Sequence, residues 1–135
     1  MPQVSKNPLD NKTKQQIFDN FYNLIARLMH KEHITVILDS LFSKTEKMMV
    51  AKRIAAVILL DHGWSTRHIC LTLKMSSATV AKFKNELDKG NIGLEDIARM
   101  FREDKKVNKI VEHLANILAE IIDFIPPHKN YIRGR

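Results

Sequence analysis

The sequence predicts an all-α protein. Only 7% of its 135 residues are aromatic and only 4 are glycine, which is too few for the strands and tight turns of an all-β domain. Apolar side chains recur instead every three or four residues through most of the chain, which is the period of an α-helix with one buried face. No segment has a convincing strand pattern, so we expect six or seven helices.

Three helices are predicted in the first half of the chain. Apolar residues at helical spacing begin near Thr13 and end at Met29, in a stripe so wide that we expect this helix to be well buried. A shorter stripe predicts a second helix over residues 34–42. The sequence SKTE at residues 43–46 fits a capping box that opens a third helix. Gly63 suits the left-handed residue that follows the end of this helix.

Two short helices follow. Ser65 is the predicted cap of a fourth helix, which runs through Leu73. A fifth helix starts at Ser76 or Ser77 and runs to about Asp88, before the glycine-containing sequence KGNIG.

The last third of the chain is also predicted to be helical. A short apolar stripe covers residues 94–101, and a broad one covers residues 107–125, where Pro126 and Pro127 stop it. The predicted organisation is a flexible N-terminus (1–11), a single all-α domain (12–125) with a helix-turn-helix at about 65–88 and extra C-terminal helices at about 94–125, and a basic tail (126–135).

The predicted first and last helices carry more apolar surface than a small bundle usually hides. Leaving such surface in water costs about 25 cal/mol per Å². We expect a homodimer interface to cover it; the alternative is that the two helices pack on each other.

Positive charge is concentrated in the middle of the chain. The net charge is +7, and residues 43–90 alone hold 9 basic and 4 acidic side chains. A localised positive field favours a polyanionic partner, and the alternative is a solvated basic face with no specific partner. The tail at 126–135 is also basic and has an aromatic side chain between its cations. It could follow phosphates as an arm, or it could be a disordered end.

The remaining composition indicates a cytoplasmic protein. The single cysteine, Cys70, excludes an intrachain disulfide. The polar first residues lack the apolar core of a signal peptide. The longest apolar runs fall far short of the roughly 20 residues that cross a membrane, so we expect no membrane partner.

The segment from Thr66 to Leu87 predicts a helix-turn-helix. Two short helices, each with one apolar face, are joined by only three residues, Lys74-Met75-Ser76, so they must pack at a steep angle. Cys70 is small enough to lie where the helices pass closest, and Met75 can anchor the turn in the core. The inward positions are Ile69, Leu73, Val80, Phe83 and Leu87.

Small and polar side chains open the second of these helices. Short side chains let a helix approach base edges closely, and hydroxyl and amide groups can hydrogen-bond to bases or phosphates. Lysine and arginine add positive charge, and a helix N-terminus favours phosphate. The alternative is a helical hairpin with a solvated outer face. The predicted DNA-binding residues are Thr66, Arg67, Lys74, Ser76, Ser77, Ala78, Thr79, Ala81, Lys82, Lys84 and Asn85.

The segment LFSKTEKMMVAKRIAAVILLDHGWSTRHICLTLKMSSATVAKFKNEL resembles the core of the Trp repressor superfamily, specifically its Trp-repressor-like members of unassigned ligand. The matching features are a capped helix bearing AKR, then LLDHG, a Ser-capped short helix, and S-x-A-T-V at the start of the recognition helix. The resemblance covers about residues 41–90. It implies an intertwined all-α dimer that binds operator DNA, with Ser77, Ala78 and Ala81 facing bases and Thr66 and Arg67 near the DNA backbone.

The resemblance also bears on ligands. In the tryptophan-responsive branch of the superfamily, two arginines sandwich the indole and a glycine follows the second. Arg53 matches the first arginine, whereas Lys82 and Phe83 replace the second arginine and the glycine. Lysine lacks the flat guanidinium that stacks on rings, so we expect no tryptophan corepressor, and an effector pocket at Arg53, Lys82 and Phe83 has no assigned ligand. Lys74 stands where the family has a turn glycine. Because a left-handed lysine costs roughly 1 kcal/mol, we expect a differently shaped turn.

No pattern predicts an enzyme or a metal site. His30 and His33 could share a helix face, but no third ligand is fixed by spacing. His62, His68 and Cys70 are close in sequence, yet Cys70 is expected to be packed inside. The chain has neither a glycine-rich phosphate loop nor the G-x-S-x-G motif.

The sequence therefore predicts a sequence-specific double-stranded DNA-binding protein, a transcriptional repressor or regulator. Its two recognition helices would enter successive major grooves about 34 Å apart. One alternative is a protein-interaction or assembly module, because residues 94–125 include a long apolar helix and carry a net negative charge. The other is the DNA-binding portion of a transposase or recombinase.

Overall fold

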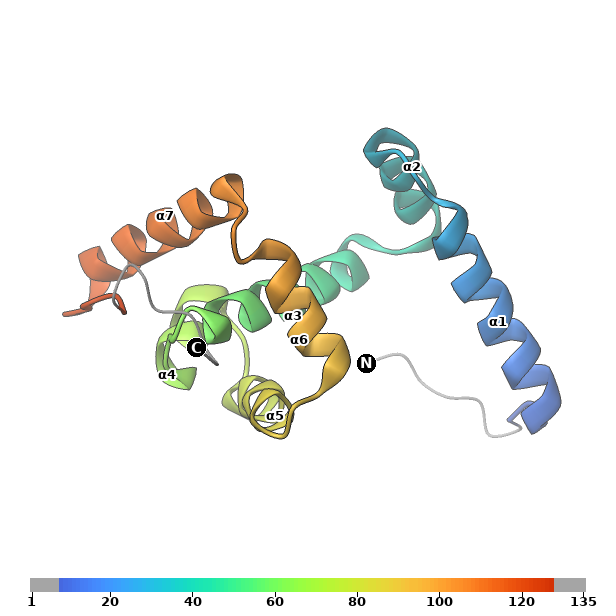
Figure 1. The fold of residues 1–135 in the computed structure, drawn as a ribbon, viewed down its shortest axis with the longest axis horizontal. Helices are drawn as coiled ribbons and strands as arrows, with labels where there is room; N and C mark the ends of the chain where they lie inside the picture. The colour runs from blue at the N-terminus through green and yellow to red at the C-terminus, as the bar shows by residue number, and fades with distance from the viewer. Residues whose placement is uncertain (1–7, 128–135) are drawn as a thin grey trace. The chain divides into compact units, whose positions relative to one another are not determined.

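The structure is a computed structural model that describes residues 8–127, and over that range it is all-helical, as predicted (Figure 1). The chain divides into two compact units, residues 1–44 and residues 45–135. The single domain expected over residues 12–125 stays a prediction. The helices are α1 (Asn11–Arg27), α2 (Lys31–Leu41), α3 (Lys44–Asp61), α4 (Thr66–Leu73), α5 (Ser77–Asp88), α6 (Ile92–Phe101) and α7 (Lys105–Ile121).

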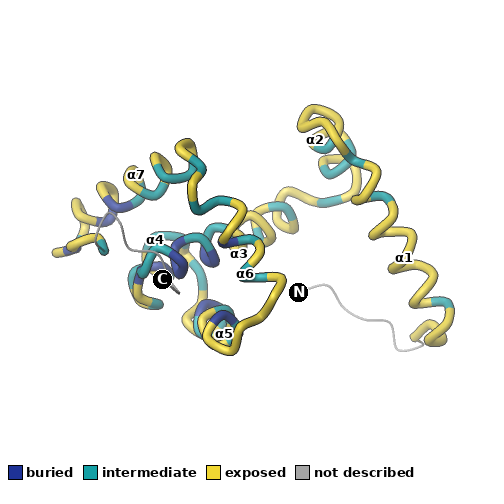
Figure 2. Tube along the Cα trace, viewed as in Figure 1, coloured by how far each residue is buried: buried dark blue, intermediate teal, exposed yellow. Residues whose placement is uncertain are grey.

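The first unit is built from α1 and α2. Asp10 caps α1, because its Oδ1 accepts a 2.7 Å hydrogen bond from the Thr13 amide, so the helix begins at Asn11 rather than near Thr13. Neither helix contains a buried residue (Figure 2). The prediction that the first helix is well buried is wrong for the single chain: its period identifies an apolar face but not a partner that covers it.

The second unit has the core. Its most deeply buried large side chains come from four different helices: Val57 and Leu59 of α3, Ile69 of α4, Val80 and Leu87 of α5, and Leu118 of α7. Burying each of these large apolar side chains stabilises the fold by about 1.5–3 kcal/mol. Helices α4 and α5 pack on each other, α4 also packs on α7, and α5 packs on α6. The two short helices are therefore held from both sides.

The end of α3 directs the chain into α4. Gly63 has φ +86°, the left-handed conformation predicted for it. Its amide donates to the Leu60 carbonyl, and the Trp64 amide donates to the Leu59 carbonyl, each at 3.0 Å. These bonds satisfy the last carbonyl groups of α3 and turn Trp64 into the core, where it is 4% exposed.

The last helix ends earlier than predicted. The apolar period continues to Ile125, but α7 ends at Ile121, and Ile122 is extended with φ −138° and ψ 166°. The reason is Phe124, whose ring lies 4.8 Å from that of Trp64 and 4.8 Å from that of His68. An extended segment brings this ring onto α4, so the helix ends before the chain reaches the two prolines.

None of the helices within residues 8–127 is both long and apolar enough to cross a bilayer. The predicted basic tail at 126–135 lies almost wholly outside the described residues, as does most of the predicted flexible N-terminus.

Candidate nucleic-acid interface

Helices α4 and α5 form the predicted helix-turn-helix. Ser65 caps α4 by accepting a 3.2 Å hydrogen bond from the His68 amide. Ser76 caps α5: its Oγ accepts a 3.2 Å hydrogen bond from the Thr79 amide and donates a 2.8 Å hydrogen bond to the Thr79 hydroxyl. Each cap supplies a partner for an amide at its helix N-terminus and fixes where that helix starts. Only residues 74–76 separate the two helices.

Lys74 makes the turn by adopting a left-handed conformation. Its φ is 56° and its ψ is 51°, and within residues 8–127 it is the sole non-glycine residue with positive φ. The expectation of a differently shaped turn is wrong, because lysine takes the conformation for which glycine is usually required. Met75 is partly buried against the core, as predicted.

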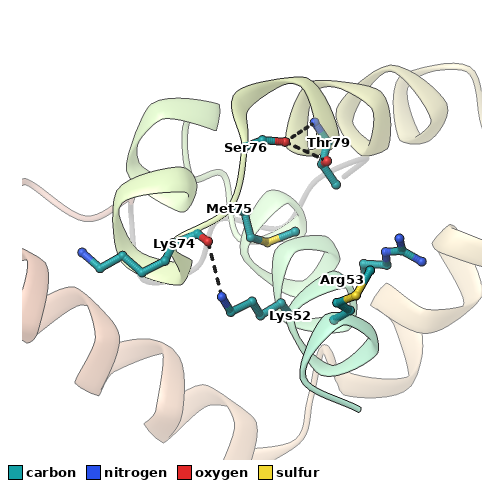
Figure 3. Close-up of a pocket in the computed structure, with 7 residues that line it drawn as sticks. Lys52, Arg53, Lys74, Met75, Ser76 and Thr79 are labelled. Carbon is teal, nitrogen blue, oxygen red and sulfur yellow. Dashed lines mark hydrogen bonds between the residues drawn. The ribbon is translucent and has the colours of Figure 1, made fainter. Parts of the chain in front are cut away.

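A small pocket of about 200 Å³ lies between α3 and this turn (Figure 3). Lys52 extends along it from α3, and its Nζ donates a 3.3 Å hydrogen bond to the carbonyl oxygen of Lys74. The side chain of Lys74 itself points away from Lys52. The pocket is lined by Met49, Lys52, Arg53, Lys74, Met75, Ser76 and Thr79.

The predicted effector pocket joined Arg53 to Lys82 and Phe83. Arg53 lines the pocket beside the turn, but neither Lys82 nor Phe83 belongs to its lining. Phe83 is half-buried and packs against the core, whereas Lys82 is exposed. The effector pocket stays a prediction, and of its three residues Arg53 lines the pocket beside the turn.

Most of the predicted DNA-binding residues lie at the surface of α4, the turn and α5. Thr66, Thr79 and Ala81 are only half-buried. The Thr79 amide donates to the Ser76 hydroxyl, and the Thr79 hydroxyl accepts from it, so both groups take part in the cap of α5. Lys84 forms a 3.1 Å ion pair with Asp88, and both side chains are about half exposed. Such a pair is worth under about 1 kcal/mol, so Lys84 can exchange it for a phosphate. The exposed members are Arg67, Lys74, Ser76, Ser77, Ala78, Lys82, Lys84 and Asn85.

The inward face holds the two helices against the rest of the unit. Ile69, Val80 and Leu87 are fully buried. Cys70, Leu73 and Phe83 are partly buried and pack against them, as the apolar pattern predicted. Because this face is fixed by packing, the exposed side of α5 is held in a defined orientation.

Sequence reasoning did not select Lys52. It lies in the AKR segment beside Arg53, and nothing in its spacing marks it as different from a solvated helix lysine. Its Nζ reaches the carbonyl oxygen of Lys74 only because the fold brings α3 next to the turn, so the contact is revealed by the structure alone.

The histidines also find structural contacts. The Nδ1 atom of His62 lies 2.8 Å from the Ile58 carbonyl oxygen, and its Nε2 atom lies 3.2 Å from Oδ1 of Asn108. His68 meets the ring of Phe124 edge-on. In the part of the chain from residue 8 to residue 127, three or more His, Cys, Asp or Glu side chains nowhere gather as a metal site would require.

Two short capped helices, a tight left-handed turn and an exposed polar face define a helix-turn-helix protein. The model of the family described as Trp repressor protein matches residues 16–101, and the chain belongs to this family. The family is one of helix-turn-helix DNA-binding regulators and not of enzymes. The match extends beyond the resembling residues 41–90 on both sides and ends before α7. No curated protein and no solved structure matches the chain.

Proposed function

We propose that this protein is a transcriptional repressor that binds specific double-stranded DNA through α4 and α5. The observation that carries the proposal is the exposed face at the N-terminal half of α5, where Ser77 and Ala78 are small and Lys82 is an exposed cation. Such a surface can enter a major groove without steric conflict.

Different residues serve affinity and specificity in this proposal. Ser77 and Asn85 offer a hydroxyl and an amide to base edges, and Ala78 can contact a thymine methyl group. Arg67 and Lys74, which flank the helix, and Lys82, which lies on it, serve as phosphate contacts. Such contacts orient the protein but carry no sequence information. The net positive charge of residues 43–90 adds a salt-dependent attraction.

We propose that the active form is a homodimer whose interface includes α1 and α2. Large apolar side chains on these helices are exposed, including Phe18 at 56%, Tyr22 at 61% and Val36 at 62%. Phe18, Phe21 and Ile25 recur at helical spacing and form one continuous stripe. A second copy of the chain would cover this stripe and provide the second recognition helix, about 34 Å from the first.

Selection of bound DNA from a random pool tests DNA binding and symmetry together. The expected result is a palindromic site with half-sites about one helical turn apart. Recovery of no enriched sequence would overturn the proposal. The paired substitution Arg67→Ala and Lys82→Ala is expected to lower the slope of log affinity against log salt concentration by about two, because two phosphate contacts are lost. Lys105→Ala with Lys109→Ala removes the same charge from α7 and is the matched control.

Analytical ultracentrifugation tests the dimer. The wild-type protein is expected to sediment as a dimer, and Phe18→Glu with Phe21→Glu is expected to yield monomers that fold but bind half-sites weakly. Glu112→Gln on the exposed side of α7 provides a control for surface substitution. A wild-type monomer at tens of micromolar would contradict the assignment of this face.

A protein-interaction module is the second candidate function. Helix α7 lies outside the family match and exposes Ile110 at 57%, Ile117 at 40% and Ile121 at 68%. Stoichiometric co-purification of another protein, together with absence of DNA binding at low salt, would favour this candidate over the repressor.

A further inference from the structure

The turn of the helix-turn-helix contains a strained residue. Lys74 has left-handed backbone angles, which cost a residue with a Cβ atom roughly 1 kcal/mol or more. Strain of this kind persists only where surrounding contacts hold the backbone in place. The contacts around Lys74 therefore decide how firmly the direction of α5 is set.

Two kinds of contact hold this backbone. The amides of Lys74 and Met75 both donate to the Cys70 carbonyl, the second at 3.3 Å. These bonds are local to the end of α4. The third contact comes from 22 residues earlier in the chain, where Lys52 Nζ donates to the Lys74 carbonyl oxygen at 3.3 Å. Figure 3 shows Lys52 reaching the turn from α3 on the side opposite the Lys74 side chain.

The position of this ammonium suits two tasks. The Lys74 carbonyl belongs to the peptide group that joins Lys74 to Met75, so the hydrogen bond from Lys52 restrains rotation of that peptide plane. The ammonium also lies at the C-terminal end of α4, where positive charge is stabilised by the helix dipole. Beyond the restrained peptide, Met75 is packed in the core and Ser76 caps α5.

We propose that Lys52 is a positioning residue for DNA recognition, which holds the turn so that α5 meets the major groove in one orientation. The role rests on the proposed DNA-binding function. Lys52 acts through the backbone of Lys74 and makes no contact with bases. It therefore contributes to the preference for the operator over random DNA, while contributing no phosphate contact of its own.

Two substitutions separate positioning from simple charge. Lys52→Met keeps the aliphatic stem beside the pocket and removes the donor, whereas Lys52→Arg retains a donor and a positive charge. Lys109→Met is the matched control, because it removes one exposed lysine charge from α7. Affinities for the selected operator and for random-sequence DNA are measured over a salt series.

Lys52→Met is expected to lower operator affinity about tenfold, as for loss of a hydrogen bond from a charged donor. Its affinity for random DNA and its salt slope should match those of Lys109→Met. Lys52→Arg should recover most of the operator affinity. Equal losses on both DNAs with a slope lowered by about one would overturn the proposal, because Lys52 would then be a phosphate contact. Unchanged operator affinity would overturn it too.

Amide hydrogen exchange without DNA supplies an independent readout. Lys52→Met should speed exchange of the Met75 amide several-fold. Exchange of the Ile69 amide, which donates a hydrogen bond to the Ser65 carbonyl, should be unchanged. Wild-type protein that binds neither DNA overturns the proposed function and this role with it. If the wild-type protein prefers its operator, and Lys52→Met changes neither this preference nor the rate of amide exchange, the positioning role alone is overturned.

Discussion

Asp61 and Arg102 form a paired contact between the end of α3 and the residue that follows α6. The Arg102 guanidinium donates from Nη2 to Oδ1 at 2.8 Å and from Nε to Oδ2 at 3.1 Å. The Asp61 side chain is 3% exposed and that of Arg102 is 19% exposed. The hydrogen bond to Asp61 raises the pKa of Arg102, which favours the charged form that arginine already has at neutral pH. The pair joins the family-matched residues to the segment that leads into α7.

Arg102→Leu is expected to destabilise the protein by about 3 kcal/mol, because it leaves the carboxylate of Asp61 buried without a partner. Urea denaturation measures the change. Arg99→Leu is the control: its 2.9 Å ion pair with Asp96 is more than half exposed, so its loss should cost under about 1 kcal/mol. Equal losses of unfolding free energy in the two variants would show that the buried Asp61–Arg102 pair stabilises the fold no more than an exposed pair does.

Phe124→Ala is expected to destabilise the protein by about 3–4 kcal/mol and to expose Trp64 to water. Phe124 is 8% exposed and covers the ring of Trp64, which is the one tryptophan of the chain. The measurement is tryptophan fluorescence, which should shift to longer wavelength, together with chemical denaturation. The neighbouring Ile125 is 92% exposed, so Ile125→Ala should change neither signal. A blue-shifted spectrum that persists in Phe124→Ala would argue against this packing.

Local signals predicted most of the fold. The caps at Ser65 and Ser76 and the left-handed Gly63 depend on side chains within a few residues, and each lies where its sequence indicates. The family resemblance could also be recognised from the sequence, because the residues 65–88 that form the helix-turn-helix lie within one short segment of chain. Predictions of this kind need no knowledge of the tertiary fold.

Contacts between distant segments could not be predicted. The stripe on α1 reveals an apolar face but not whether the same chain covers it. Ile125 continues the apolar period of α7, yet the attraction of Phe124 for Trp64 ends the helix at Ile121. Lys52 could not be distinguished from a solvated lysine because its partner, the carbonyl oxygen of Lys74, is 22 residues away in sequence and comes within reach only in the folded chain.

The start of α1 is expected to depend on acidic pH. The hydrogen bonds from Thr13 lower the pKa of Asp10 below its ordinary value. A lowered carboxyl pKa means that the cap is fully effective above the ordinary value of about 3.9 and is lost as pH falls through the lower folded-state pKa. Chemical shifts of the Thr13 amide measured from pH 6 to pH 2 should report this loss. Asp10→Asn keeps a capping oxygen without titrating, so its Thr13 amide should show no such transition.

Lys74→Gly is expected to stabilise the protein by about 1 kcal/mol, because glycine adopts the left-handed conformation without strain. Lys89→Gly is the matched control. Lys89 also follows the end of a helix, but its φ of −80° and ψ of −4° are right-handed, so glycine there should be neutral or destabilising by up to about 1 kcal/mol. Urea denaturation of the two variants measures both effects. In DNA titrations, Lys74→Gly should also lower the salt slope by about one if its side chain contacts a phosphate. A variant that loses stability at position 74 would show that the lysine side chain contributes more to the turn than its backbone strain costs.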